Sequence, residues 1–306
     1  MSIIVKRTAN NGKLVIAGDL GRRVAFIQHH HMNYLASNEK TANFFQAIDN
    51  LLTPVVGLPL NPQKDIVVIT GGAKGVGSHL AAKFDSLNYK TIIIDKRYPL
   101  ELKSPHNVSF YECDISDFEL TRLILDDITV RFGQITVLID AISLKSFADT
   151  DLKGTVGLKK LMRTVYAGSL NVIQHILPRM IVHDRGYIVD IASIEGKVTT
   201  KGRSLYGSIQ ATKFKLMQQT ELTLKKYFHR NHFASNGRVR CLLVVSSEEL
   251  NGEVSVDTNL AEVVFSSILH NRQGVRAMSI GTHFKLSLRE LDWHWYQCFK
   301  YLSLQN

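Results

Sequence analysis

The sequence predicts an α/β fold in which a doubly wound parallel sheet has helices on both faces. Five continuous apolar runs have the length of strands, and helical patterns lie between them. Because the runs do not alternate with polar residues, we expect strands that are covered on both faces. Strands and helices that alternate along the chain favour a parallel sheet. The five runs are IVVIT (66–70), TIIID (91–95), ITVLID (135–140), YIVDIA (187–192) and VRCLLVV (239–245).

Two further segments flank this pattern. The chain divides into an N-terminal extension (1–63), the α/β domain (64–282) and a C-terminal tail (283–306). An apolar stretch in the extension, 44–60, is interrupted by Pro54 and Pro59, which predicts a short helix packed on the protein or lying on a membrane surface. Apolar residues recur at helical spacing in the tail and predict an amphipathic helix. This helix either docks on the body or faces a partner or a membrane.

The composition excludes several classes of protein. The net charge is +10, but no basic run is interleaved with aromatic residues, so no nucleic-acid partner is expected. No apolar stretch reaches the roughly 18 residues of a spanning helix. The adjacent His29, His30 and His31 do not share a helical face, so no metal site is predicted.

The same features bear on the compartment. The three cysteines are too few for a disulfide framework and fit a reducing environment. We therefore expect an intracellular protein that is cytoplasmic or peripheral to a membrane. The first acidic residue is Asp19, so a mitochondrial presequence stays open.

A glycine-rich stretch, VVITGGAKGVGSHLA (67–81), directly follows an apolar strand and directly precedes a helix. Glycines let the backbone turn sharply and approach a pyrophosphate, whose charge is met by the N-terminus of the helix. The placement between strand and helix therefore predicts a dinucleotide site. Its cofactor-binding candidates in this stretch are Thr70, Gly71, Gly75, Val76 and Gly77.

Residues after the next two strands predict which dinucleotide binds. Asp95 ends the second strand, where a carboxylate can accept hydrogen bonds from the ribose hydroxyls of NAD. Lys96 and Arg97 follow and could instead meet the 2′-phosphate of NADP. We favour NAD and leave NADP open. Asp114 fits a contact to the edge of the adenine.

Together with a later serine and tyrosine, these motifs resemble those of the short-chain dehydrogenase/reductase (SDR) superfamily. The resemblance covers roughly residues 65–282 and implies a Rossmann-like fold that binds NAD(P). Ser193 precedes Tyr206 by thirteen positions, as in the family. The resemblance implies that Ser193 holds the substrate oxygen and Tyr206 passes the proton. It also implies a homo-oligomer built through two long helices. The extension and tail are similar to those of the membrane-associated hydroxysteroid and retinol dehydrogenase branch.

The catalytic pattern departs from the family at the lysine. YGSIQATK (206–213) has Gln210 where the family has the lysine that binds the nicotinamide ribose and lowers the pKa of the tyrosine. Gln210 shares the helix face of Tyr206 but has no charge. Lys213 lies about 10 Å from Tyr206 along the helix axis, so its side chain would reach back only under strain.

Other departures point the same way. Asp140–Ser143 replaces the Asn-Asn-Ala-Gly segment under the cofactor, Val165 replaces the relay asparagine, and Val244–Val245 replaces Pro-Gly. The stretch that follows, SSEELNGEVSVDTN, is short for a substrate lid. Binding is thus better preserved than catalysis.

Three functions follow from this balance. The first is an SDR-like NAD(P)(H)-binding protein with impaired or lost dehydrogenase activity, which acts through cofactor sensing or partner contacts. The second is an active oxidoreductase on a hydrophobic alcohol or ketone of the lipid, steroid or retinoid type, with Ser193 and Tyr206 as catalytic residues. The third is a structural or membrane-surface protein that binds no nucleotide.

Overall fold

The structure is a computed structural model of the whole chain, which divides into two units, residues 1–48 and 49–306. In the first unit it describes an antiparallel pair of short strands, β1 (Lys6–Arg7) and β2 (Leu14–Val15). In the second it describes residues 59–102, 105–142, 154–197, 204–230, 239–246, 254–270 and 274–277. Several predicted features lie outside the described residues: the three histidines, residues 44–58 of the apolar stretch, Ser143 and the tail 283–306.

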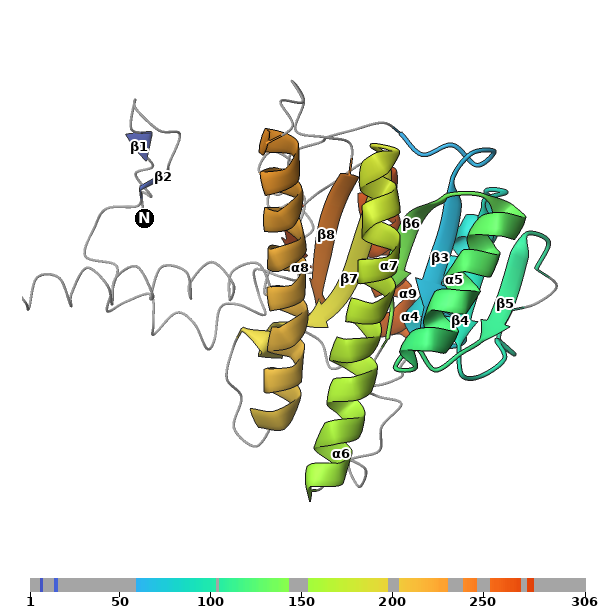
Figure 1. Ribbon diagram of the computed structural model, residues 1–306. Helices are drawn as coiled ribbons and strands as arrows, with labels where there is room; N and C mark the ends of the chain where they lie inside the picture. Colours follow the sequence, from blue (N-terminus) through green and yellow to red (C-terminus); the bar gives the residue numbers. More distant parts are fainter. Residues whose placement is uncertain are drawn as a thin grey trace, which may run out of the picture. The chain divides into compact units, whose positions relative to one another are not determined.

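The second unit is built on a parallel sheet of seven strands, which confirms the predicted fold class (Figure 1). The strand order is β5-β4-β3-β6-β7-β8-β9, and every neighbouring pair is parallel. The strands are β3 (Ile66–Thr70), β4 (Lys90–Asp95), β5 (Val108–Glu112), β6 (Ile135–Asp140), β7 (Gly186–Ser193), β8 (Val239–Ser246) and β9 (Gly274–Ala277). The five apolar runs thus form the central strands. Between its neighbours β4 and β6, β3 is the point where the strand order reverses.

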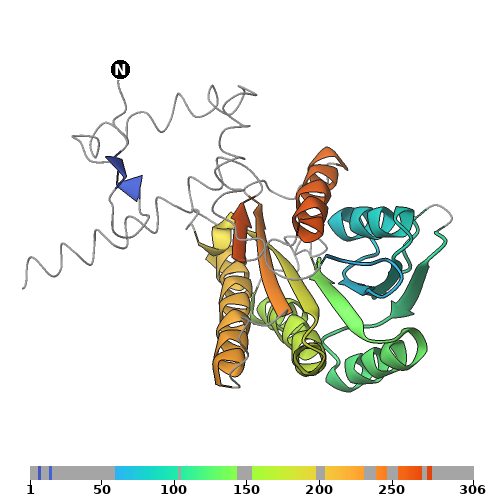
Figure 2. The same ribbon diagram turned by 90° about the horizontal axis from the view of Figure 1, so that it is seen from above.

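Helices cover both faces of the sheet (Figure 2). One face is covered by α5 (Phe118–Phe132), α7 (Gly168–Val182) and α8 (Ser204–Arg230), and the other by α4 (Gly75–Ser86) and α9 (Val254–Leu269). Alternate residues of each strand point to opposite faces. Accordingly Val68 lies in the core cluster that includes Leu125 of α5, whereas Ile69 lies in the cluster that includes Leu80 of α4.

The long helical pattern before β7 contains an irregular segment. It begins as α6 (Gly154–Leu161), widens to π-helical geometry over Met162–Ala167 and continues as α7. Single π-helical turns are frequent at functional sites. Here the turn includes Val165, the residue predicted at the position of the relay asparagine.

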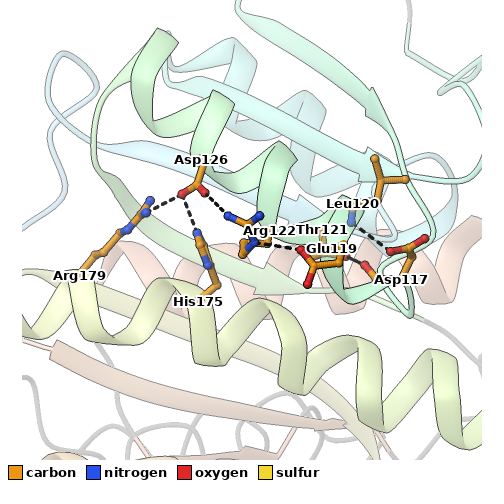
Figure 3. A network of polar contacts seen from close by, with 8 residues as sticks. All are labelled: Asp117, Glu119, Leu120, Thr121, Arg122, Asp126, His175 and Arg179. Atoms are coloured by element: carbon orange, nitrogen blue, oxygen red, sulfur yellow. Dashed lines mark hydrogen bonds and ion pairs between the residues drawn. The ribbon is translucent and has the colours of Figure 1, made fainter.

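A polar cluster joins α5 to α7 on the outside of the sheet (Figure 3). Asp126 of α5 accepts hydrogen bonds from Arg179 Nη2 at 2.5 Å, and its Oδ1 lies 3.0 Å from Nε2 of His175. The hydrogen bond from Arg179, together with His175, lowers the pKa of Asp126. The cluster thus links the two helices through their side chains.

Among the described helices, none is long and apolar enough to cross a membrane. Within the same residues, no three histidine, cysteine or acidic side chains lie close enough to hold a metal ion.

Candidate functional site

The predicted glycine loop lies between β3 and α4, at the carboxyl edge of the sheet. Gly71 and Gly75 have positive φ angles of 71° and 58°, which side chains of L-residues rarely adopt. A Cβ on Gly71 would lie 2.9 Å from the backbone nitrogen of Ile142, and one on Gly77 would overlap the carbonyl oxygen of Gly71. Glycine at these positions therefore lets the loop after β3 pack against both the first turn of α4 and the residues that follow β6. Ligands of open α/β sheets bind at this edge, beside the strand where the order reverses.

The N-terminus of α4 lies directly after the glycine loop. The side chain of its N-cap residue, Lys74, makes no capping hydrogen bond. The first N–H groups of a helix have no partner within the helix and, with the helix dipole, attract negative charge. The residues present at this loop thus fit a pyrophosphate.

Asp95, at the end of β4, is hydrogen-bonded to the backbone of the glycine loop. Its Oδ2 accepts a hydrogen bond from the N–H of Ala73 at 3.1 Å, and its Oδ1 accepts one from the N–H of Arg97 at 3.2 Å. The half-buried carboxylate therefore lies against the loop, where the sequence predicts the ribose of the cofactor.

Lys96 forms an ion pair with Asp114, with Nζ 2.6 Å from Oδ2. Desolvation of Asp114 opposes ionisation, but the hydrogen bonds from Lys96 and from Ser116 outweigh it and lower the pKa of Asp114. Two residues that the sequence assigned to different parts of the cofactor thus contact each other.

Ser193 and Gln210, two of the predicted catalytic residues, lie in contact. Ser193 ends β7, and its backbone N–H donates to Oε1 of Gln210 at 2.9 Å. The Ser193 hydroxyl accepts a hydrogen bond from the N–H of Glu195 at 3.3 Å. Tyr206 lies in the first turn of α8, one turn before Gln210, and its side chain is outside the described residues.

The backbone of α8 is held close to the end of β7. A 3₁₀ turn, Ile194–Gly196, follows Ser193 directly. A Cβ on Gly196 would lie 2.7 Å from the carbonyl carbon of Gln210. Glycine at this position therefore lets the turn approach the helix closely enough for the Gln210 side chain to bond Ser193.

Lys213 is buried inside the domain, one turn beyond Gln210. Its side chain is 1% exposed, and Nζ donates to Oδ1 of Asp190 at 2.6 Å and to the carbonyl oxygen of Ile191 at 3.0 Å. A second carboxylate oxygen, Oδ2 of Asp140, lies 3.8 Å away. From the sequence, Lys213 could reach back to Tyr206 only under strain. In the structure its ammonium group is bonded to the buried strand residues instead.

Burial and the neighbouring charges determine the protonation of Asp190. Its pKa is raised to about 7, chiefly by desolvation and also by the nearby Asp140 carboxylate, while the Lys213 ammonium acts in the opposite direction. An acidic residue within an apolar strand was the sequence signal for this pair, since such a residue requires a buried cation.

Asp140 occupies the predicted floor of the site at the end of β6. Its Oδ1 accepts hydrogen bonds from the Thr70 hydroxyl at 3.0 Å and from the N–H of Ile142 at 3.1 Å. Its Oδ2 accepts one from the hydroxyl of Ser169 in α7. Asp140, Thr70, Ser169 and Lys213 thus form a continuous buried polar network with Asp190.

The position of the predicted relay asparagine is apolar. Val165 is fully buried in a small cluster with Leu161 and with Ile209, the neighbour of Gln210 in α8. None of these side chains can hydrogen-bond a water. Apolar side chains therefore occupy the position where the resemblance implies a proton relay.

Comparison with known proteins assigns the chain to one family. A sequence profile of the short chain dehydrogenases matches residues 65–231. The chain is 28% identical over 163 residues to dehydrogenase/reductase SDR family member 7B of Xenopus tropicalis, covering 48% of this chain and 52% of that protein. It is 28% identical over 174 residues to an uncharacterized oxidoreductase of Staphylococcus saprophyticus, covering 54% and 74% of the two chains. The chain thus spans about half the length of the first of these relatives.

Solved structures show the same fold. The structure of ElxO with NADP bound superposes with a TM-score of 0.56 at 24% identity, covering 72% of this chain and 98% of ElxO. The aldohexose dehydrogenase of Thermoplasma acidophilum superposes with the same TM-score of 0.56 at 19% identity, covering 72% and 95% of the two chains. With the match of the family profile over more than half of the sequence, this chain belongs to the short-chain dehydrogenase/reductase family.

Proposed function

We propose that this chain binds a nicotinamide dinucleotide at the glycine loop and has impaired or lost dehydrogenase activity, so that it acts through cofactor sensing or partner contacts. Support for binding comes from the backbone of the loop, from the N-terminus of α4, where the N-cap side chain makes no capping hydrogen bond, and from the NADP bound in the structurally similar ElxO. When bound, the dinucleotide would supply the hydride chemistry. Thr70 to Gly77 would hold its pyrophosphate, and Asp95 would hold its ribose.

The observation that supports impaired catalysis is the environment of Gln210. Its amide oxygen accepts from the N–H of Ser193, and the next lysine along the helix is bonded to Asp190. A free tyrosine titrates near 10, and lowering its pKa to about 7 requires roughly 4 kcal/mol. A neutral amide supplies little of this energy, and the charge of Lys213 is balanced by buried carboxylates. We therefore expect the pKa of Tyr206 to stay at about 10, so that its hydroxyl exchanges protons with a substrate poorly at neutral pH.

The ion pair between Lys96 and Asp114 supports NAD over NADP. Of the two cations that could meet a 2′-phosphate, Lys96 and Arg97, Lys96 is already paired, with its Nζ 2.6 Å from the carboxylate of Asp114. Asp95 would also repel a phosphate at the ribose. We expect tighter binding of NADH than of NADPH.

A second function is an active oxidoreductase on a hydrophobic alcohol or ketone. The observation that favours it is the spacing and place of Ser193 and Tyr206, with the serine at the carboxyl end of β7 and the tyrosine in the first turn of α8. In this case Ser193 would hold the substrate oxygen.

Titration calorimetry of the full chain with NADH and NADPH tests the proposal, followed by a turnover assay with hydrophobic ketones. Micromolar binding without turnover is the expected result. Turnover that is lost in Tyr206→Phe would establish the second function instead. No binding of either dinucleotide at millimolar concentration would refute both and leave a structural protein.

A further inference from the structure

A carboxylate from a distant part of the chain touches the glycine loop. Oδ2 of Asp257 lies 3.0 Å from the position that a Cβ on Gly75 would take, and its Cγ lies 3.6 Å from the same point. Gly75 is the first residue of α4. The Asp257 side chain therefore lies against the first turn of the helix whose N-terminus would face a pyrophosphate.

The packing of two helices places Asp257 there. It lies in the first turn of α9, which runs beside α4 on the same face of the sheet (Figure 2). The rings of Phe84 and Phe265 pack edge to face with centroids 5.0 Å apart, and Lys83 pairs with Glu262. The connection from β8 to α9 spans only residues 247–253, so α9 begins close to the carboxyl edge of the sheet.

A second carboxylate lies at the next turn of α4. Oε2 of Glu101, an exposed residue of the segment after β4, lies 2.8 Å from the hydroxyl of Ser78. Ser78 follows Gly75 by three positions and thus lies on the same face of the helix. The loop itself contributes one cation, Lys74. The carboxylates of Asp257 and Glu101 therefore both lie against the first two turns of α4.

These contacts bear on the affinity for phosphates. The N-terminus of a helix stabilises negative charge, whether it belongs to a ligand or to a side chain of the protein. A pyrophosphate bound at the first turn of α4 would lie near these like charges, and repulsion between charges close together at a protein surface corresponds to on the order of tenfold or more in affinity.

We propose that Asp257 and Glu101 are affinity-determining residues of the glycine-loop site. Their carboxylates compete with the dinucleotide phosphates for the N-terminus of α4. The dissociation constant of the cofactor is therefore higher than it would be without these two charges. This inference rests on the proposed function, because it assigns an affinity to that same site. A weak site of this kind responds to changes in the concentration of a dinucleotide, as a sensor does.

The test uses Asp257→Asn, Glu101→Gln and the double variant, titrated with NADH and separately with inorganic pyrophosphate. Both substitutions keep the shape of the side chain and remove its charge. Glu262→Gln is the matched control, because it removes the same charge from α9 at a residue that pairs with Lys83. We expect tenfold tighter binding of both ligands in Asp257→Asn, a smaller gain in Glu101→Gln and less than twofold change in the control.

Each outcome decides between the two proposals. If the wild type binds NADH and both single variants bind it with the same affinity, the inference is overturned and the proposed function stays in place. Wild-type chain that binds no NADH, next to a double variant that binds NADH and pyrophosphate, would support the inference and overturn the proposed function. If neither ligand binds any form of the chain, both are overturned. Glu101→Gln changes an exposed residue, so it keeps the test decisive if Asp257→Asn fails to fold.

Discussion

Replacing Lys213 by methionine tests whether the buried charges below the site stabilise one another. Lys213 is 1% exposed, with its ammonium group 2.6 Å from Asp190 and 3.8 Å from Asp140. Methionine has a similar length but no charge. The variant therefore keeps most of the packing and leaves two buried carboxylates without their cation.

The expected cost follows from burial and protonation. Removing one partner of a buried ion pair costs about 3–5 kcal/mol, because the other charge remains desolvated. The carboxyls of the variant can escape part of this cost by binding protons. Between the unfolded pKa and the raised folded pKa, a carboxyl is ionised in the unfolded chain and protonated in the folded chain. In this range the free energy of unfolding falls by about 1.4 kcal/mol for each pH unit and each such carboxyl. The loss of stability is thus expected to be smallest near pH 5 and to grow as the pH rises above about 7.

The assay is urea unfolding followed by circular dichroism at about pH 5 and about pH 8. Lys215→Met is the matched control, because Lys215 is an exposed residue of the same helix. A surface change of this kind is expected within about 0.5 kcal/mol of the wild type. The reasoning is refuted if Lys213→Met and Lys215→Met are equally stable at both pH values.

Three further substitutions test neighbouring parts of the structure. The folded pKa of Asp190, about 7, exceeds the unfolded value of about 3.9, so the wild type should lose stability as the pH rises from about 4 to 7; Asp190→Asn should flatten this part of a plot of melting temperature against pH. Arg185→Met should cost about 2–4 kcal/mol in urea unfolding, because it leaves the fully buried Asp65 carboxylate without its guanidinium, and a loss below 1 kcal/mol would contradict this. Gly77→Ala should lower the melting temperature by several degrees or prevent folding, since its Cβ would overlap the carbonyl oxygen of Gly71; an unchanged melting temperature would show that the loop adapts.

The central strands could be predicted from the sequence because burial on both faces leaves a continuous apolar run. Residues 66–70 and 135–140 coincide with β3 and β6. The edge strand β5, VSFYE, is only half-buried, so it lacks such a run. The glycine loop was equally readable, because its conformation depends on residues that are adjacent in the chain.

The contacts of the site were less predictable, because they join residues that are far apart in the sequence. Helical spacing placed Gln210 on the face of Tyr206, but the backbone N–H that it bonds belongs to β7. The position of Asp257 at Gly75 depends on the packing of α4 against α9, and no local pattern indicates it. Local periodicity predicts which face a residue occupies, and tertiary packing decides its partner.

Restoring the family lysine at position 210 is expected to destabilise the chain. Gln210 is 4% exposed, and its Oε1 is a hydrogen-bond acceptor for the N–H of Ser193 at 2.9 Å. A lysine only donates, so Gln210→Lys leaves this buried N–H unpaired at a cost of about 1–3 kcal/mol and also buries a further charge. Gln210→Met removes the acceptor without adding charge and should cost less than Gln210→Lys in urea unfolding.

The same pair of variants separates stability from chemistry. If Gln210 has become a structural residue, Gln210→Lys should bind dinucleotide no better than the wild type and gain little turnover, since the variant keeps the other departures from the family pattern, among them Asp140 and Val165. A variant that is as stable as the wild type and turns over a ketone rapidly would refute this. It would show that the Ser193 N–H finds another acceptor and that the missing charge alone separates this chain from an active dehydrogenase.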